Sequence, residues 1–119
     1  MNPSFYSAAI FALALAFATA SADAHSKTET TQPADGAVLQ AAPQAIALRF
    51  ETPMRITLIS LTDQDGVTHD LNRSDNMKAV REFSAKPPAL PAGQYKVEWR
   101  GLAADGHPMQ GMFTFEIAP

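Results

Sequence analysis

The chain has 119 residues, of which 46% are hydrophobic and 18% charged, and its formal net charge is −3. This composition is typical of one small globular domain and unlike that of a disordered or repetitive chain. The charge gives no sign of the basic surface that a nucleic-acid partner requires. The sequence contains no cysteine, which excludes disulfides, thiol catalysis and thiolate metal sites.

Residues 1–24 have the pattern of a secretory signal peptide. The apolar run from Ala8 to Ala18 has the length of a signal-peptide hydrophobic region, and Ala22 and Ala24 supply the small residues of a cleavage site. The segment before the run has no Lys or Arg, which departs from the usual pattern. A short transmembrane anchor is the alternative, but the run is short for a membrane span. The sequence therefore predicts export, cleavage after Ala24, and a mature domain of residues 25–119.

The mature chain shows patterns of β-strands and no long helical pattern. Apolar residues alternate with polar ones in three segments, and a fourth is more apolar along its length and is predicted to be a central strand. The alternating segments are 45–50, 94–100 and 112–117, and the apolar one is 55–62. Turn signals rich in Gly, Pro and Asp separate them. Short strands at this spacing predict a single all-β domain, a β-sandwich, with a small closed barrel as the alternative.

The candidate metal ligands are two of the three histidines and one aspartate. If the chain is cut after Ala24, His25 becomes the first residue and offers both its α-amine and its imidazole. Asp105 and His107 stand two residues apart in a turn segment, so their side chains can project to one side. Together they would give three nitrogens and one oxygen, a donor set that suits Cu(II). The alternatives are a solvated terminal histidine and a turn aspartate beside a surface histidine.

The third histidine, His69, is predicted to have a structural role. It alternates with Val67 and Leu71, so it is expected to be partly buried in a strand rather than to bind metal. Trp99 is expected to be a core residue.

The mature chain resembles the CopC family of periplasmic copper-binding proteins almost from end to end. The resemblance rests on the histidine after the cleavage site and on the segments PADGAVLQAAPQAIALRF, LPAGQYKVEWR and ADGHPMQGMFTFEI. It implies an immunoglobulin-like (Ig-like) Greek-key β-sandwich of about seven strands. It also implies one Cu(II) per chain, held by the amine and imidazole of His25, by Asp105 and by His107.

The family implies a protein that buffers, stores or delivers periplasmic copper in copper homeostasis or resistance. Its expected partners are the copper ion and an inner-membrane CopD-like copper transporter, with no nucleic acid. Two other classes remain open. One is a histidine-brace copper enzyme resembling an oxidase, although Asp105 would then occupy a copper position that oxygen needs. The other is a metal-free Ig-like interaction module.

The chain departs from the family pattern at two places. Some members hold Cu(I) in a loop rich in methionine, whose soft thioether selects Cu(I). The corresponding segment here, residues 61–80, contains only Met77, and the other methionines are scattered and expected to fill gaps in packing. We therefore expect no Cu(I) site in this loop. Some members also carry a glutamate near copper where this chain has Thr52, and Glu51 is expected on the opposite face if the strand continues.

Overall fold

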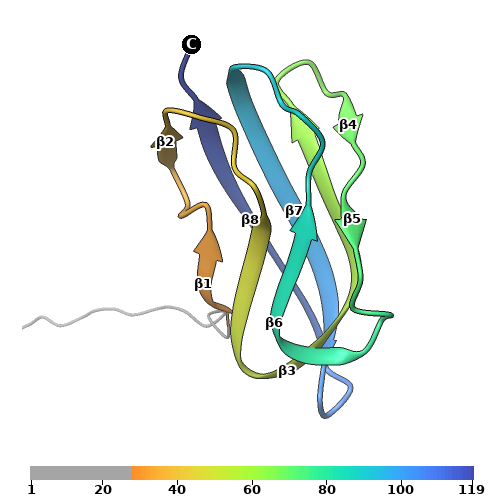
Figure 1. Ribbon diagram of the computed structural model, residues 1–119. Helices are drawn as coiled ribbons and strands as arrows, with labels where there is room; N and C mark the ends of the chain where they lie inside the picture. The colour runs from red at the N-terminus through yellow and green to blue at the C-terminus, as the bar shows by residue number, and fades with distance from the viewer. Residues whose placement is uncertain (1–27) are drawn as a thin grey trace, which may run out of the picture.

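The computed structural model describes residues 28–119, and this part of the chain consists of strands and loops (Figure 1). The strands are β1 (Thr28–Gln32), β2 (Ala37–Leu39), β3 (Ile46–Asp63), β4 (Thr68–His69), β5 (Asn72–Arg73), β6 (Ala79–Lys86), β7 (Gly93–Ala103) and β8 (Pro108–Ile117). No helix in the described residues has the length and apolar character needed to cross a membrane. The proposed signal peptide and His25 lie outside the described residues.

The all-β prediction is confirmed, and the segment predicted to be a central strand is part of β3. This strand is 18 residues long and changes its pairing partners along its length. Its first part pairs with β1 on one side and β6 on the other, whereas its second part pairs with β7 and β4. The pairing with β6 shifts register between Arg49 and Met54, and Pro53, which has no N–H to donate, lies in this interval.

The strands form one continuous hydrogen-bonded sheet in the order β2-β8-β7-β3-β6-β5, with β1 and β4 also paired to β3. Because β3 bends, this sheet folds into the two layers of the sandwich, β1-β3-β6-β5 and β4-β3-β7-β8-β2, which we call its two sheets. All pairs are antiparallel except β2 with β8. Residues 28–119 contain eight strands where about seven were expected, and two of these eight have only two residues each.

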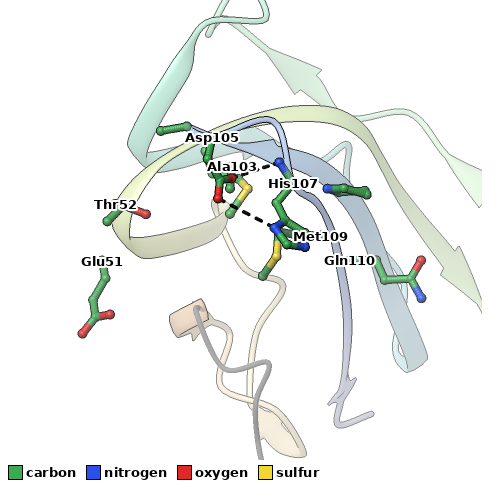
Figure 2. Close-up of a pocket in the computed structure, with 10 residues that line it drawn as sticks. Glu51, Thr52, Ala103, Asp105, His107, Met109 and Gln110 are labelled. Carbon is green, nitrogen blue, oxygen red and sulfur yellow. Dashed lines mark hydrogen bonds and ion pairs between the residues drawn. The ribbon is translucent and has the colours of Figure 1, made fainter.

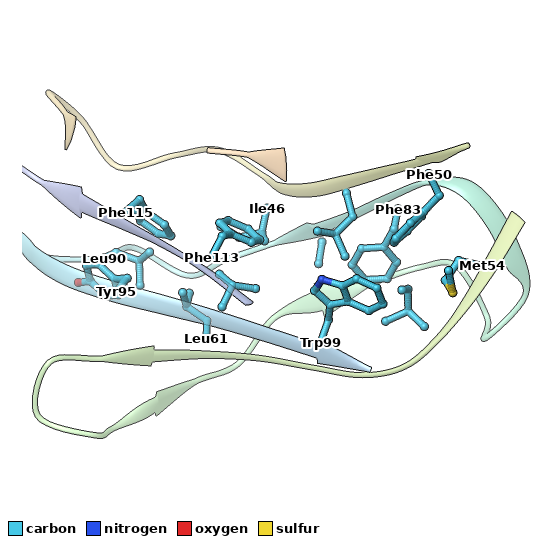
Figure 3. Close-up of a cluster of buried hydrophobic side chains, with 14 of the residues drawn as sticks. Ile46, Phe50, Met54, Leu61, Phe83, Leu90, Tyr95, Trp99, Phe113 and Phe115 are labelled. Atoms are coloured by element: carbon cyan, nitrogen blue, oxygen red, sulfur yellow. The ribbon is translucent and has the colours of Figure 1, made fainter. Parts of the chain in front are cut away.

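The core lies between the sheets and contains the residues that the alternating patterns placed inward (Figure 3). The buried residues from these patterns are Ile46, Leu48, Phe50, Tyr95, Val97, Trp99, Phe113, Phe115 and Ile117. Trp99 is 2% exposed, and its ring meets that of Phe50 edge-on at 5.3 Å. The expectation that Trp99 is a core residue is confirmed.

Trp99 needs a glycine opposite it. Gly111 is the partner of Trp99 across β7 and β8, and a Cβ atom at Gly111 would lie 2.6 Å from Trp99 Nε1. The absent side chain of Gly111 therefore makes room for the indole ring between the sheets.

Tyr95, near the start of β7, ties this strand to the preceding loop. Its hydroxyl donates a hydrogen bond of 2.5 Å to the carbonyl of Pro91, four residues earlier. Ig-type sandwiches contain the same feature, a tyrosine corner in which a hydroxyl binds backbone a few residues upstream. This contact agrees with the expected Ig-like sandwich.

Candidate metal site

Asp105 and His107 lie in the turn that joins β7 to β8, at one end of the sandwich. The turn closes through two backbone hydrogen bonds, from Gly106 N to Ala103 O at 2.8 Å and from Ala103 N to His107 O at 2.9 Å. Gly106 has a φ of 85°, a left-handed conformation that glycine adopts without strain. Because Gly106 reverses the chain between them, the two candidate ligands sit on either side of the turn.

The Asp105 carboxylate is held by the turn itself. Its Oδ1 accepts a hydrogen bond of 3.0 Å from the backbone N–H of His107, and this bond lowers the pKa of the Asp105 carboxyl. The side chain is therefore an anion at neutral pH. Its second oxygen, Oδ2, lies 3.7 Å from His107 Nδ1 (Figure 2).

This separation of donor atoms suits a shared metal ion. When two ligands each bind one metal ion at about 2.0–2.2 Å, the distance between their donor atoms depends on the angle between the two bonds. It is about 3 Å for a right angle and about 4 Å when the bonds point in opposite directions. The 3.7 Å between Oδ2 and Nδ1 falls within this interval. The side chains of Asp105 and His107 are 73% and 71% exposed, so an ion from solvent reaches both without opening the fold.

The pair borders a hollow between the β7–β8 turn and the bend of β3. Besides Asp105 and His107, the walls are Glu51, Thr52, Met54, Ala103, Ala104, Pro108, Met109 and Gln110. Glu51 and Thr52 are both exposed and line the hollow, at the point where the pairing of β3 with β6 shifts register. Figure 2 shows the Glu51 carboxylate directed away from His107.

The predicted Cu(II) site is not complete within the described residues. Among residues 28–119, no three His, Asp or Glu side chains gather as a metal-binding group. The third predicted ligand residue, His25, lies outside this range. Copper binding by His25, Asp105 and His107 therefore stays a prediction, with Asp105 and His107 already close together.

The start of β1 lies next to the hollow. Thr28 is paired with Phe50, the residue before Glu51 in the wall. His25 precedes Thr28 by three residues, and three extended residues span about 10 Å. This neighbourhood follows from the antiparallel pairing of β1 with β3, which no local pattern in the sequence reveals.

His69 has the structural environment that its sequence pattern predicts. It lies in β4 and is partly buried, and its Nε2 donates a hydrogen bond of 2.9 Å to Asp63 Oδ2. This bond lowers the pKa of the Asp63 carboxyl. The imidazole also meets the Tyr95 ring edge-on at 6.0 Å. Because Asp63 holds one nitrogen of His69 and the ring packs against Tyr95, His69 is fixed in the fold.

We expect His69→Ala to leave Cu(II) affinity unchanged and to reduce thermal stability, because the variant loses contacts with Asp63 and Tyr95 only. His107→Ala is the matched control, since it removes an exposed histidine and is expected to weaken Cu(II) binding while leaving stability unchanged. Competition titration with a Cu(II) chelator and thermal unfolding of both variants provide the comparison. A loss of affinity in His69→Ala as large as that in His107→Ala would contradict the structural assignment.

Comparison with known proteins agrees with the fold and with the sequence resemblance. The CopC domain family matches residues 28–118. Copper resistance protein C of Pseudomonas syringae pv. tomato is 32% identical over 110 residues, which cover 83% of this chain and 85% of that protein. Copper resistance protein C of Escherichia coli is 31% identical over 110 residues, with 82% and 84% covered.

Solved structures show the same relationship. The crystal structure of CopC from Methylosinus trichosporium OB3b superposes with a TM-score of 0.68 at 27% identity, covering 80% of this chain and 95% of that one. The family match extends from the first residue of β1 through β8. The chain therefore belongs to the CopC family.

Proposed function

We propose that this protein is exported, cleaved after Ala24, and binds one Cu(II) in the periplasm through His25, Asp105 and His107. The α-amine and imidazole of His25 supply two nitrogens, His107 supplies a third and Asp105 supplies an anionic oxygen. It holds this ion for buffering, storage or delivery in copper homeostasis or resistance, with an inner-membrane CopD-like transporter as the receiving or supplying partner.

The observation that carries this proposal is the Asp105–His107 pair, whose donor atoms are 3.7 Å apart at an open end of the sandwich. A surface pair of this kind contributes little to stability, and the turn leaves both side chains exposed, so their donor atoms are open to an ion from solvent. Imidazole nitrogen and carboxylate oxygen in a tetragonal arrangement suit Cu(II), which stands at the top of the affinity order for such ligands.

The pairing of β1 supports His25 as the remaining ligand residue. Thr28 is paired with Phe50, which directly precedes Glu51 and Thr52 in the wall of the hollow. A residue three positions before Thr28 is therefore within reach of the Asp105–His107 pair. The α-amine has a reference pKa of about 7.7–8.0, so Cu(II) displaces a weakly held proton at neutral pH.

The relatives support the choice of copper and of a binding role. The two curated relatives compared above are named copper resistance proteins, and their matches cover most of both chains. Holding an ion with four protein donors also leaves no equatorial position for oxygen, which favours binding over an oxidase-like reaction.

The exported protein is expected to begin at His25 and to bind one Cu(II) with three nitrogens and one oxygen. Intact mass spectrometry of protein purified from the periplasm measures the first residue. Electron paramagnetic resonance of the same sample, titrated with Cu(II), measures the donor set and the stoichiometry. A mature chain that starts elsewhere yet binds Cu(II) equally well would overturn the proposal.

A further inference from the structure

Two methionines that are 55 residues apart in the sequence line the hollow beside Asp105 and His107. Met54 enters from β3, directly after its bend, and Met109 enters from the start of β8. Met54 is 1% exposed, and Met109 is partly buried against the core. Figure 2 shows the Met109 thioether and the His107 imidazole on the same side of the turn, directed into the hollow. Asp105 and His107 therefore form the exposed rim of the hollow, which carries oxygen and nitrogen donors. Met54 and Met109 form its floor, which carries sulfur.

Gly101 brings the two thioethers together. Met54 and Met109 stand on the strands that flank β7, and the register opposes Met54 to Ala103 and Met109 to Gly101. Met54 Sδ packs against Gly101, and it lies 3.2 Å from the position that a Cβ atom of residue 101 would occupy. Directly opposed residues in antiparallel strands have side chains on the same face, about 5 Å apart. The side chain of Met109 therefore approaches the space above Gly101 from the other side.

The chemistry of this floor differs from that of the rim. Thioether sulfur is a soft ligand that selects Cu(I), whereas carboxylate oxygen and amine nitrogen favour Cu(II), and imidazole serves both oxidation states. Packing against Gly101 explains the position of Met54. It does not explain why the thioether of Met109 lines a hollow that also carries His107.

We infer that the hollow binds Cu(I) as well as Cu(II), with the thioethers of Met54 and Met109 and the imidazole of His107 as the Cu(I) ligands. This inference rests on the proposed function, because both use His107 as a copper ligand. A shared His107 makes the two oxidation states compete for one hollow, so the protein holds one copper ion at a time. No electron transfer is implied, since each ion binds in the oxidation state in which it arrives.

Met109→Leu is the variant that tests the sulfur floor. Leucine conserves the apolar volume and removes the sulfur, and Met109 is not among the proposed Cu(II) ligands. We expect Cu(I) affinity to fall at least about tenfold, which corresponds to about 1.4 kcal/mol, and Cu(II) affinity to stay unchanged. Cu(I) is delivered anaerobically as its bathocuproine disulfonate complex, and X-ray absorption reports the loss of Cu–S scattering.

Met112→Leu is the matched control. Met112 lies on the same strand, is 59% exposed and is not part of the hollow wall. It is expected to bind Cu(I) like the parent protein. Thermal unfolding of both variants without metal shows whether each retains the fold. Equal Cu(I) affinity in the parent and in folded Met109→Leu, or Cu(I) bound without sulfur scattering, would overturn the inference.

Competition between the oxidation states is tested with Ag(I), a soft ion of the same charge as Cu(I) that needs no reductant. Adding one equivalent of Ag(I) to the Cu(II)-loaded protein is expected to release Cu(II), which changes the electron paramagnetic resonance spectrum to that of free Cu(II). Simultaneous binding of both ions would show that they use separate sites and would contradict the shared hollow. The spectrum before Ag(I) is added tests the Cu(II) ligands by itself, so failure of the proposed function is distinguished from failure of this inference.

Discussion

A form of the protein that keeps Ala24 ahead of His25 is expected to bind Cu(II) at least about tenfold more weakly than the form that begins at His25. The added residue converts the His25 nitrogen from an amine into an amide, which binds copper only after losing a strongly held proton. The free amine moves one residue away, so it no longer forms the same chelate ring with the imidazole. All side chains of the proposed site remain, and only the terminal nitrogen changes.

A competition titration with a Cu(II) chelator compares this extended form with the native start and with Asp105→Asn. Asp105→Asn is also expected to weaken binding, because a neutral amide oxygen replaces an anionic ligand. Both proteins are expected to unfold at the temperature of the parent without metal, since Asp105 lies in an exposed turn and outside the core. If the extended form binds Cu(II) as tightly as the native start, the amine is not a ligand.

Trp99→Ala is expected to lower the free energy of unfolding by about 3–5 kcal/mol, the usual cost of truncating a buried aromatic residue. Trp99 is 2% exposed and packs between Phe50 and Gly111, so its loss leaves a cavity that the rigid strands fill poorly. Small domains are stable by only about 5–15 kcal/mol, and the variant is therefore close to unfolding. Urea unfolding without metal measures this change.

Met112→Ala is the matched control for this measurement. Met112 is apolar and lies one residue from Gly111 on β8, but it is 59% exposed, so its truncation is expected to change stability by no more than about 0.5 kcal/mol. If Trp99→Ala were as stable as Met112→Ala, the indole ring would not be a core anchor.

The fold class and the inward faces of the strands follow from the sequence by itself. Side chains alternate between the two faces of a strand, so a pattern such as that around Tyr95, Val97 and Trp99 marks the buried face without knowledge of the partner strands. The proximity of Asp105 and His107 follows for a similar reason. Two residues on either side of a glycine in a tight turn lie close together whatever the rest of the chain does.

Other features of the site were decided by the tertiary structure. Glu51 and Thr52 both line the hollow, because β3 changes its pairing partners around this point. Met54 and Met109 look scattered in the sequence, and the register of β3 and β8 against β7 brings them to the same glycine. The start of β1 reaches the hollow through pairing with a strand about twenty residues later.

The distinction between the two groups of features has one physical cause. Alternation and turn conformation depend on residues that are neighbours in the chain, and the sequence determines them directly. The walls of the hollow depend on which strands pair, in which register, and where β3 bends, and these are set by the packing of the whole core.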